Sequence, residues 1–293
     1  MKKIILTLVF AIVLAACNQP GQVKETITKG ITEVYVDETL LPIMQEQEEV
    51  FESVYKYADI KLIPKPETEL VKDLMNLDAK ILILPRELST EEIATLRSKS
   101  YIGRITPLAT DAIVTIVNKS DSKDKITTQE IFDILQGKNT TRQLVFDNQN
   151  SSTLNFLMKK AGVTALPKNG VTALKNCNEV IKFVSENKNF IGFVGVNWML
   201  SPDADSENDL KNVKVLAVGN TLEKAVKPSQ TAIYTGEYPF VRKIFMLNYQ
   251  GKAGLGMGFA SFIAGDIGQR IILKSGLLPH NIPTRELRIR KEL

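Results

Sequence analysis

The stretch Ala79-Lys80-Ile81-Leu82-Ile83-Leu84 decides the fold class of this chain of 293 residues. It is apolar except for Lys80, and such a continuous apolar run is typical of a strand that is buried on both faces of a parallel sheet. A helical pattern precedes it over 68–77, and Ser89-Thr90-Glu91-Glu92 forms a capping box that predicts another helix after it. Because strand and helix signals alternate around this stretch, the sequence predicts an α/β fold.

The alternation continues in both directions along the chain. Strands are predicted over 31–36, 60–63, 113–117, 144–146, 191–196 and 213–218, and helices from Leu40, from Leu154 and over 178–185. A second capping box, Thr127-Thr128-Gln129-Glu130, predicts a helix that ends at Gly137. We expect loops over 147–153 and over the glycine-rich segment 251–258, followed by a single closing helix over 259–273.

The N-terminus has the features of a secretory signal. Lys2 and Lys3 precede an apolar run over 4–16, which is too short to span a bilayer. The run ends in Leu14-Ala15-Ala16-Cys17, which resembles the bacterial lipobox. We expect 1–16 to be a signal peptide, Cys17 to carry acyl chains such as palmitate, and 17–29 to be a tether. An ordinary signal peptide that lies near a cysteine is the alternative.

These features predict a lipid-anchored protein of the cell envelope that faces the periplasm or the exterior.

The formal net charge of +4, about +2 without Lys2 and Lys3, is too weak to predict nucleic-acid binding. With Cys17 acylated, Cys177 has no partner for a disulfide. With one histidine, His280, the chain has too few His and Cys residues for a metal site with several such ligands. A Ser-His-acid triad would have to use His280, and no Gly-x-Ser-x-Gly elbow is present. A catalytic carboxylate pair stays open, but we expect no enzyme and no cofactor.

Several segments, in this order and spacing, together resemble one family, the phosphate ABC transporter substrate-binding proteins (PstS-like). These segments are 105–118, 126–138, Ser151-Ser152-Thr153, Tyr238-Pro239-Phe240-Val241-Arg242 and 268–279. The resemblance implies a two-lobed periplasmic-binding-protein-like (type II) fold with two hinge crossings, near Thr110 and Tyr234. It implies one lobe of 30–110 plus 235–293, a second lobe of 111–234, and a monomer.

The candidate ligand-binding residues lie at two strand–loop–helix junctions. Free N–H groups and hydroxyls at such junctions suit an anion. The resemblance implies that these loops face each other across a cleft. We therefore expect ligand contacts from Glu38, Thr39, Arg86, Ser151, Ser152 and Thr153. Alternatively, each hydroxyl only caps its helix, and Arg86 pairs with Glu91 or Glu92. Asp111 matches an aspartate of the crossing segment, which we expect to stabilise the hinge.

The chain departs from the family pattern where phosphate would bind. Asp147 stands where the family has an Arg, Ser152 replaces a Gly, Asp37 and Glu38 replace Gly and Ser, and Lys80 replaces an Asp. The first hypothesis is capture of phosphate or a similar oxyanion for an ABC importer, with Lys80 or Arg86 compensating for the lost Arg. The alternative is an envelope interaction module that binds no small anion and docks on a membrane complex.

Overall fold

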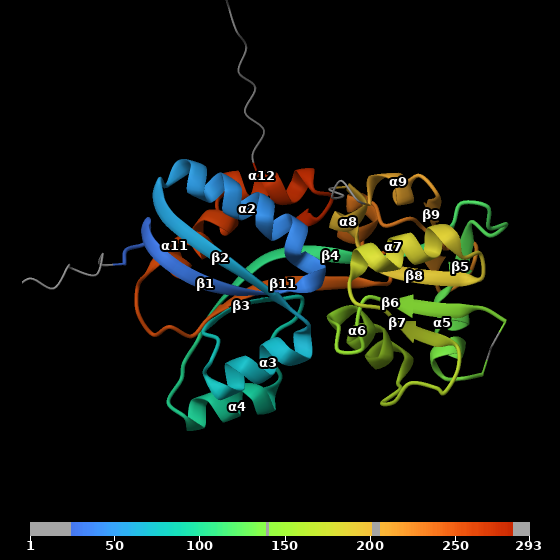
Figure 1. The fold of residues 1–293 in the computed structure, drawn as a ribbon, viewed down its shortest axis with the longest axis horizontal. Coiled ribbons are helices and arrows are strands. Elements are labelled where there is room, and N and C mark those ends of the chain that lie inside the picture. The colour runs from blue at the N-terminus through green and yellow to red at the C-terminus, as the bar shows by residue number, and fades with distance from the viewer. Residues whose placement is uncertain (1–24, 139–140, 201–205, 284–293) are drawn as a thin grey trace, which may run out of the picture.

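The computed structural model describes residues 25–138, 141–200 and 206–283. The predicted signal peptide, Cys17 and most of the predicted tether lie outside the described residues. Strands and helices alternate along the described chain, which confirms the predicted α/β class (Figure 1). No helix among the described residues is both long enough and apolar enough to cross a membrane.

The strands and helices have the following bounds. The strands are β1 Lys29–Asp37, β2 Tyr57–Lys65, β3 Ile81–Leu84, β4 Arg104–Asn118, β5 Lys125–Thr127, β6 Gln143–Phe146, β7 Val171–Ala173, β8 Phe190–Gly195, β9 Val213–Val215, β10 Ala217–Gly219, β11 Val241–Asn248 and β12 Leu278–Pro279. The helices are η1 Glu38–Leu40, α2 Leu41–Val54, α3 Glu67–Asn76, α4 Thr90–Ser98, α5 Thr128–Leu135, α6 Ser152–Ala161, α7 Cys177–Glu186, α8 Val196–Leu200, α9 Glu207–Leu210, α10 Gln230–Tyr234, α11 Leu255–Ala264 and α12 Asp266–Lys274.

The main sheet is mixed and has the strand order β2-β1-β3-β11-β4-β8-β6-β7. All four residues of β3 are buried, as its apolar run predicts. The strand is parallel to β1 on one side and antiparallel to β11 on the other, so the expectation of a parallel sheet holds on one side only.

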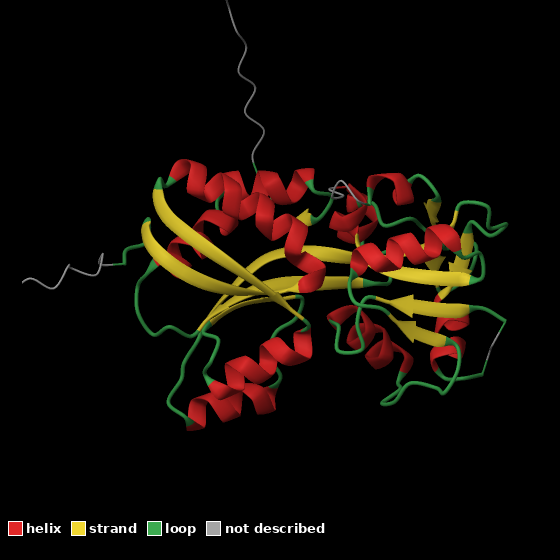
Figure 2. Cartoon of the chain, viewed as in Figure 1, coloured by secondary structure: helices red, strands yellow, loops and turns green. Residues whose placement is uncertain are grey.

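Strand β4 joins the two halves of the molecule. Its first part pairs with β11, and its residues 113–116 pair with β8. Helices lie on both sides of the sheet in each half (Figure 2). The sheet therefore passes from one half to the other close to Asp111, near the predicted hinge at Thr110.

The strand predicted over 213–218 is two strands. Strand β9 pairs with β4, whereas β10 pairs with β5 in a separate two-stranded sheet, so the chain changes sheets at Leu216.

The closing region also differs from the prediction. The expected loop over 251–258 ends early, because α11 begins at Leu255. The expected single helix is broken at Gly265, whose extended backbone (ψ 176°) ends α11 and begins α12. The expected loop over 147–153 likewise ends at Ser151, because α6 begins at Ser152.

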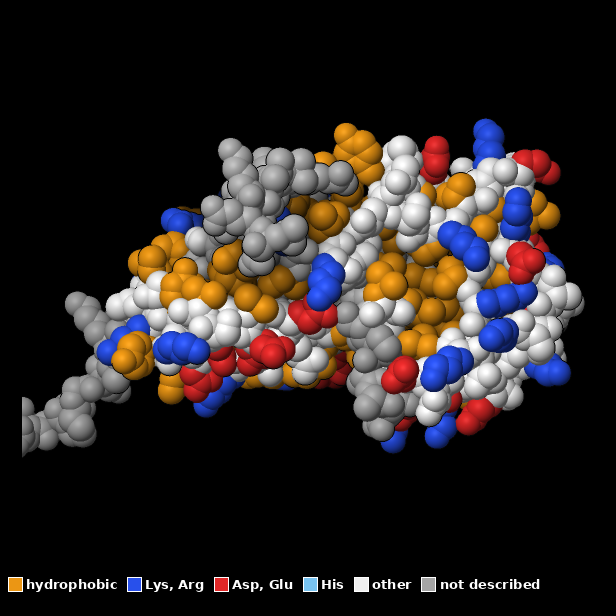
Figure 3. Space-filling view, turned by 90° about the horizontal axis from the view of Figure 1, so that it is seen from above, with side chains coloured by type: hydrophobic (Ala, Val, Ile, Leu, Met, Phe, Trp, Pro, Cys, Tyr) orange, Lys and Arg blue, Asp and Glu red, His pale blue; other side chains and the backbone are white. Residues whose placement is uncertain are grey.

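The surface carries mixed charge. On the face shown in Figure 3, Lys and Arg side chains are interspersed with Asp and Glu, and apolar patches lie between them. Such mixing gives weak long-range attraction for any polyanion.

Candidate functional site

The candidate site lies where strand ends from both halves meet. Strand β1 ends at Asp37 and β6 ends at Phe146, and each is followed by a turn into a helix. Asp111 of β4 and Arg242 of β11 lie opposite each other in the antiparallel register. In α/β folds, ligands bind outside the carboxyl ends of such strands.

Arg242 is the centre of the site. Its side chain is almost fully buried, and Nη2 forms an ion pair with Asp111 Oδ2 at 2.5 Å. Nη1 donates to the hydroxyl of Ser152 at 2.8 Å and to that of Thr153 at 3.4 Å, and Nη2 donates to the hydroxyl of Thr39 at 3.2 Å. Burial opposes its charge, but Asp111 and Asp37 raise the pKa of Arg242, so the guanidinium stays cationic.

Asp37 accepts hydrogen bonds from the groups that were predicted to bind an anion. Its Oδ1 accepts from the Thr39 backbone N–H at 3.0 Å, from the Thr39 hydroxyl at 2.5 Å and from the Ser152 hydroxyl at 3.0 Å. Burial raises the pKa of Asp37 to about 7, although Arg242 acts in the opposite direction. The Asp37 carboxylate therefore joins the end of β1 to the start of α6.

The site holds more acid than base. Burial, and then repulsion from Asp147 and Asp37, raises the pKa of Glu38 to about 7. Burial also raises the pKa of Asp147, which is 1% exposed, to about 6. Within the described part of the chain, neither Asp147 carboxylate oxygen has a hydrogen-bond partner. These carboxyls thus exchange protons near neutral pH rather than staying fixed anions.

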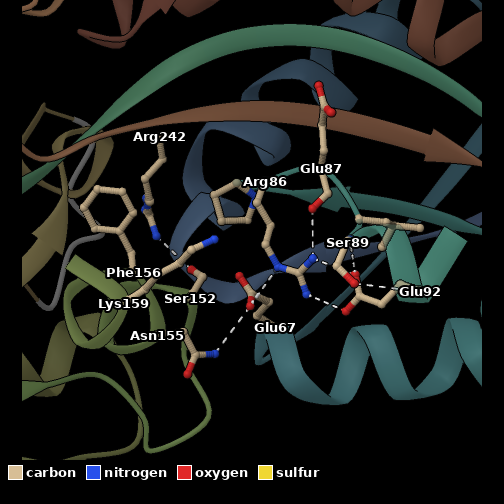
Figure 4. Close-up of a pocket in the computed structure, with 12 residues that line it drawn as sticks. Glu67, Arg86, Glu87, Ser89, Glu92, Ser152, Asn155, Phe156, Lys159 and Arg242 are labelled. Carbon is tan, nitrogen blue, oxygen red and sulfur yellow. Dashed lines mark hydrogen bonds and ion pairs between the residues drawn. The ribbon is translucent and has the colours of Figure 1, made fainter. Parts of the chain in front are cut away.

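A cavity of about 460 Å³ opens beside Arg242. Ser152 and Arg242 belong both to the cavity wall and to the buried hydrogen-bonded cluster. Its other lining residues are Glu67, Pro85, Arg86, Glu87, Leu88, Ser89, Glu92, Asn155, Phe156 and Lys159 (Figure 4). The cavity gives a ligand access to one end of the cluster.

Three predicted hydroxyls converge on Arg242, namely those of Thr39, Ser152 and Thr153. Ser151 does not join them, because its hydroxyl accepts from the backbone N–H of Leu154 and caps α6. Glu38 lies beside the cluster and is partly buried.

Arg86 lines the cavity and is also paired. Its guanidinium donates to both carboxylate oxygens of Glu92 at 2.8 and 2.9 Å and lies 3.1 Å from Glu67. Lys80 is exposed and is not among the lining residues. The positive charge at the cluster therefore comes from Arg242. The sequence contains the signal for it in Tyr238-Pro239-Phe240-Val241-Arg242, but the motif alone does not indicate where the side chain points.

Asn197 and Trp198, which were not predicted as site residues, complete the back of the site. The Trp198 indole donates to the Thr39 carbonyl at 2.9 Å, and the Asn197 amide donates to the same oxygen at 3.2 Å. Trp198 is 7% exposed, so its ring packs in the interior while its indole N–H makes this bond. Both side chains hold the Thr39 turn against α8.

The remaining candidates for chemistry lie elsewhere. Cys177 is a free buried thiol at the start of α7, and burial raises its pKa. His280 is exposed and does not line the cavity. Among the described residues, no group of three or more His, Cys, Asp or Glu side chains is arranged to hold a metal ion.

Comparisons with known proteins agree with this architecture. Residues 1–18, which include Cys17, match the prokaryotic membrane lipoprotein lipid attachment site. Protein SphX of Synechococcus elongatus is 27% identical over 229 residues, which cover 71% of this chain and 65% of SphX, just under two thirds of that protein.

Two solved structures have a similar fold. A Clostridium perfringens structure described as a phosphate ABC transporter substrate-binding protein with bound phosphate has a TM-score of 0.71 and 20% identity. That similarity covers 86% of this chain and 100% of the other. An ABC-type phosphate transport receptor from Vibrio cholerae has a TM-score of 0.65 and 17% identity, with 85% and 100% covered.

The match that covers most of the sequence is to the PBP superfamily domain, over residues 23–266. It agrees with the predicted two-lobed binding-protein fold and with the mixed sheet seen in the structure. This chain belongs to the PBP superfamily.

Proposed function

We propose that this protein is a membrane-anchored solute-binding lipoprotein that captures phosphate, or a similar small oxyanion, in the cavity beside Arg242. The observation that carries the proposal is the convergence of one buried guanidinium with the hydroxyls of Thr39, Ser152 and Thr153. A guanidinium and hydroxyls are the donors that suit a tetrahedral oxyanion, and a buried site strengthens each charge-assisted bond.

The surplus of carboxyls favours an oxyanion that carries a proton. Asp37 and Asp147 have pKa values of about 7 and about 6, so near neutrality Asp37 is partly protonated and Asp147 is mostly ionised. A protonated phosphate donates to an ionised carboxylate, whereas sulfate has no proton to donate at this pH. We therefore expect the site to prefer phosphate over sulfate and to bind it more tightly as the pH falls from 8 to about 6.

The anchor and the transport role rest on the comparisons. The lipid attachment match supports acylation of Cys17 and a position on the envelope membrane with the folded part facing outward. The similar structures, described as components of phosphate transport, support delivery of the ligand to an ABC permease.

A specific observation favours the alternative, an envelope interaction module that binds no small anion. Asp37 already accepts from the Thr39 and Ser152 hydroxyls, so it competes with any oxyanion for these donors. If Asp37 kept these hydroxyls permanently, no small anion would bind. The protein would then act through its outer surface, by docking on a membrane complex.

Calorimetric titration separates the two functions. The protein, purified from membranes in a neutral detergent, is titrated with phosphate and with sulfate at pH 6, 7 and 8. We expect phosphate binding that is weakened roughly tenfold or more in Ser152→Ala, since a hydrogen bond to a charged group is lost. Ser261→Ala, which removes one exposed hydroxyl of α11, is the matched control and should bind normally.

Absence of heat and of thermal stabilisation by millimolar phosphate at all three pH values would rule out the phosphate proposal. The interaction module would then be the better account of the same fold.

A further inference from the structure

We infer that the natural ligand is a phosphomonoester with a small, uncharged, hydroxyl-bearing organic group, and that this group occupies the cavity outside the buried cluster. The inference rests on the proposed function and names the class of ligand for the same site. It is carried by the size of the cavity, by the order of its lining residues and by their charges.

The cavity is larger than a bare oxyanion needs. Its volume of about 460 Å³ lies within the range of roughly 300–1,000 Å³ that is usual for organic ligands. A phosphate ion has five heavy atoms and occupies on the order of 100 Å³, a few times the share of one water molecule. A phosphate ion at Arg242 therefore leaves most of the cavity free for the rest of a larger ligand.

The lining residues are ordered from a buried end to a mouth. At the buried end lie Ser152 and Arg242, which are 2% and 3% exposed. Arg242 Nε is a buried donor without a hydrogen-bond partner among the described residues. At the mouth lies Lys159, which is exposed. A phosphoryl group thus fits the buried end, and its ester substituent extends towards Lys159.

The two walls between these ends offer polar and apolar contacts. Asn155 and Phe156 of α6 form one wall, and Ser89, which precedes α4, forms part of the other (Figure 4). Leu88 also lines the cavity. The Asn155 amide makes only long contacts, at 3.4 Å to Glu67 and 3.5 Å to Thr68. An amide in such contacts remains able to bind a ligand hydroxyl.

The charge of the walls excludes a second anionic group between them. Arg86 is neutralised by Glu92 and Glu67, which raise its pKa despite its burial. Glu87 adds a negative charge to the same wall. The Arg86 wall therefore favours hydroxyls over carboxylates or phosphates, so the part of the organic group that lies against this wall is polar and uncharged. Lys159 contributes its positive charge at the mouth, outside this wall.

The test compares inorganic phosphate, glycerol 3-phosphate and glycerol by calorimetric titration of the detergent-purified protein at pH 6.5. We expect glycerol 3-phosphate to bind at least tenfold more tightly than phosphate. In Asn155→Leu, which removes the amide but leaves the cavity open to phosphate, this advantage should fall below about threefold while phosphate affinity stays within about threefold. Lys182→Leu, an exposed position of α7, is the control substitution, and thermal unfolding checks that each variant is folded.

The outcomes separate the inference from the proposed function. Phosphate that binds as tightly as the ester, or tighter, overturns the inference and leaves the proposed function standing. An ester advantage that survives Asn155→Leu undiminished also overturns it, because the organic group then lies elsewhere. If neither compound binds to the folded protein, the inference and the proposed function both fail.

Discussion

At the scale of single residues, the ion pair between Arg242 and Asp111 dominates the energetics of the site. Both side chains are nearly inaccessible to solvent, and the pair lies between neighbouring strands β4 and β11. A buried pair contributes little net stability, but removing one partner leaves an uncompensated charge. The pair therefore fixes Arg242 in place for the hydroxyls that it contacts.

The variant Arg242→Met should lower the free energy of unfolding by about 3–5 kcal/mol, because Asp111 is left buried without its partner. Urea unfolding at pH 7 measures the loss. In the double variant Asp111→Asn/Arg242→Met most of the loss should be recovered, and an equal loss in both variants would contradict this account.

Asp147 links stability to pH. Its pKa is about 6 in the folded protein against a model value of 3.8, so the folded state holds the proton more tightly than the unfolded chain does. The stability gained by holding this proton is present at low pH and is lost as the pH rises from about 4 through 6. Above that window Asp147 is a buried anion.

Asp147→Asn should therefore raise the free energy of unfolding at pH 7.5 by about 1–3 kcal/mol, since one pKa unit corresponds to about 1.4 kcal/mol. At pH 4.5 the gain should shrink to about a third of its value at pH 7.5, because most of the window between the two pKa values lies above that pH. Urea unfolding at both pH values tests this, and a gain that does not depend on pH would show that charge is not the cause.

At the scale of elements, two adjacent serines at the start of α6 have different roles, one in capping the helix and one in the candidate site. Ser151 accepts from the Leu154 N–H and caps the helix, whereas the next residue, Ser152, contacts Arg242. The two adjacent hydroxyls thus have different roles, although the sequence does not distinguish them.

Ser151→Ala should lower the free energy of unfolding by about 1 kcal/mol and change phosphate affinity by less than about twofold. Thermal unfolding and calorimetric titration on the same sample measure both quantities. A tenfold loss of affinity without a loss of stability would instead make Ser151 a ligand contact.

Helix α11 contains glycines because it packs closely against other parts of the chain. A Cβ at Gly258 would lie 1.7 Å from the Ile27 carbonyl oxygen, and one at Gly256 would lie 2.2 Å from Ile81 Cδ1. The glycine-rich segment was predicted as a loop, since glycine disfavours helices when only local propensity is considered. Close packing outweighs that propensity here.

Gly258→Ala should therefore lower the midpoint of thermal unfolding and cost about 1–3 kcal/mol, because the added methyl group meets backbone that has little freedom to move. Ser261→Ala on the same helix is the control and should change stability little. A Gly258→Ala protein as stable as the natural one would mean that α11 shifts easily relative to Ile27.

At the scale of the whole molecule, contacts across the site hold the two halves together. Asp37 accepts from Ser152, and the indole of Trp198 donates to the Thr39 carbonyl. Trp198 is the only tryptophan of the chain, so its fluorescence reports on this junction. A ligand that changes how the halves are arranged must bind the two arrangements with different affinity.

Asp37→Ala, which removes the bond to Ser152, should favour an open arrangement in the absence of ligand. We expect Trp198 emission at longer wavelength and a larger radius of gyration in X-ray scattering than for the natural protein. Phosphate at saturating concentration should reverse both changes. Identical emission and radius in the two proteins would show that other contacts keep the halves closed.

The sequence by itself determined the local structure. Capping boxes at Ser89 and Thr127 predicted helix starts that the structure confirms, and the apolar run before Pro85 predicted the buried strand β3. These signals succeed because capping and burial patterns depend on residues close together in the chain. The site hydroxyls of Thr39, Ser152 and Thr153 were predicted from the strand–loop–helix junctions in which they lie.

Only the tertiary structure decided how these junctions are used. Arg242 reaches Ser152 and Thr39 from strand β11, at sequence separations of 90 and 203 residues, and Asp37 contacts Ser152 across 115 residues. No local pattern encodes such contacts, because they depend on strand order and register. The charge balance of the site follows from the same packing, since burial in the assembled fold raises the pKa values of Asp37 and Asp147.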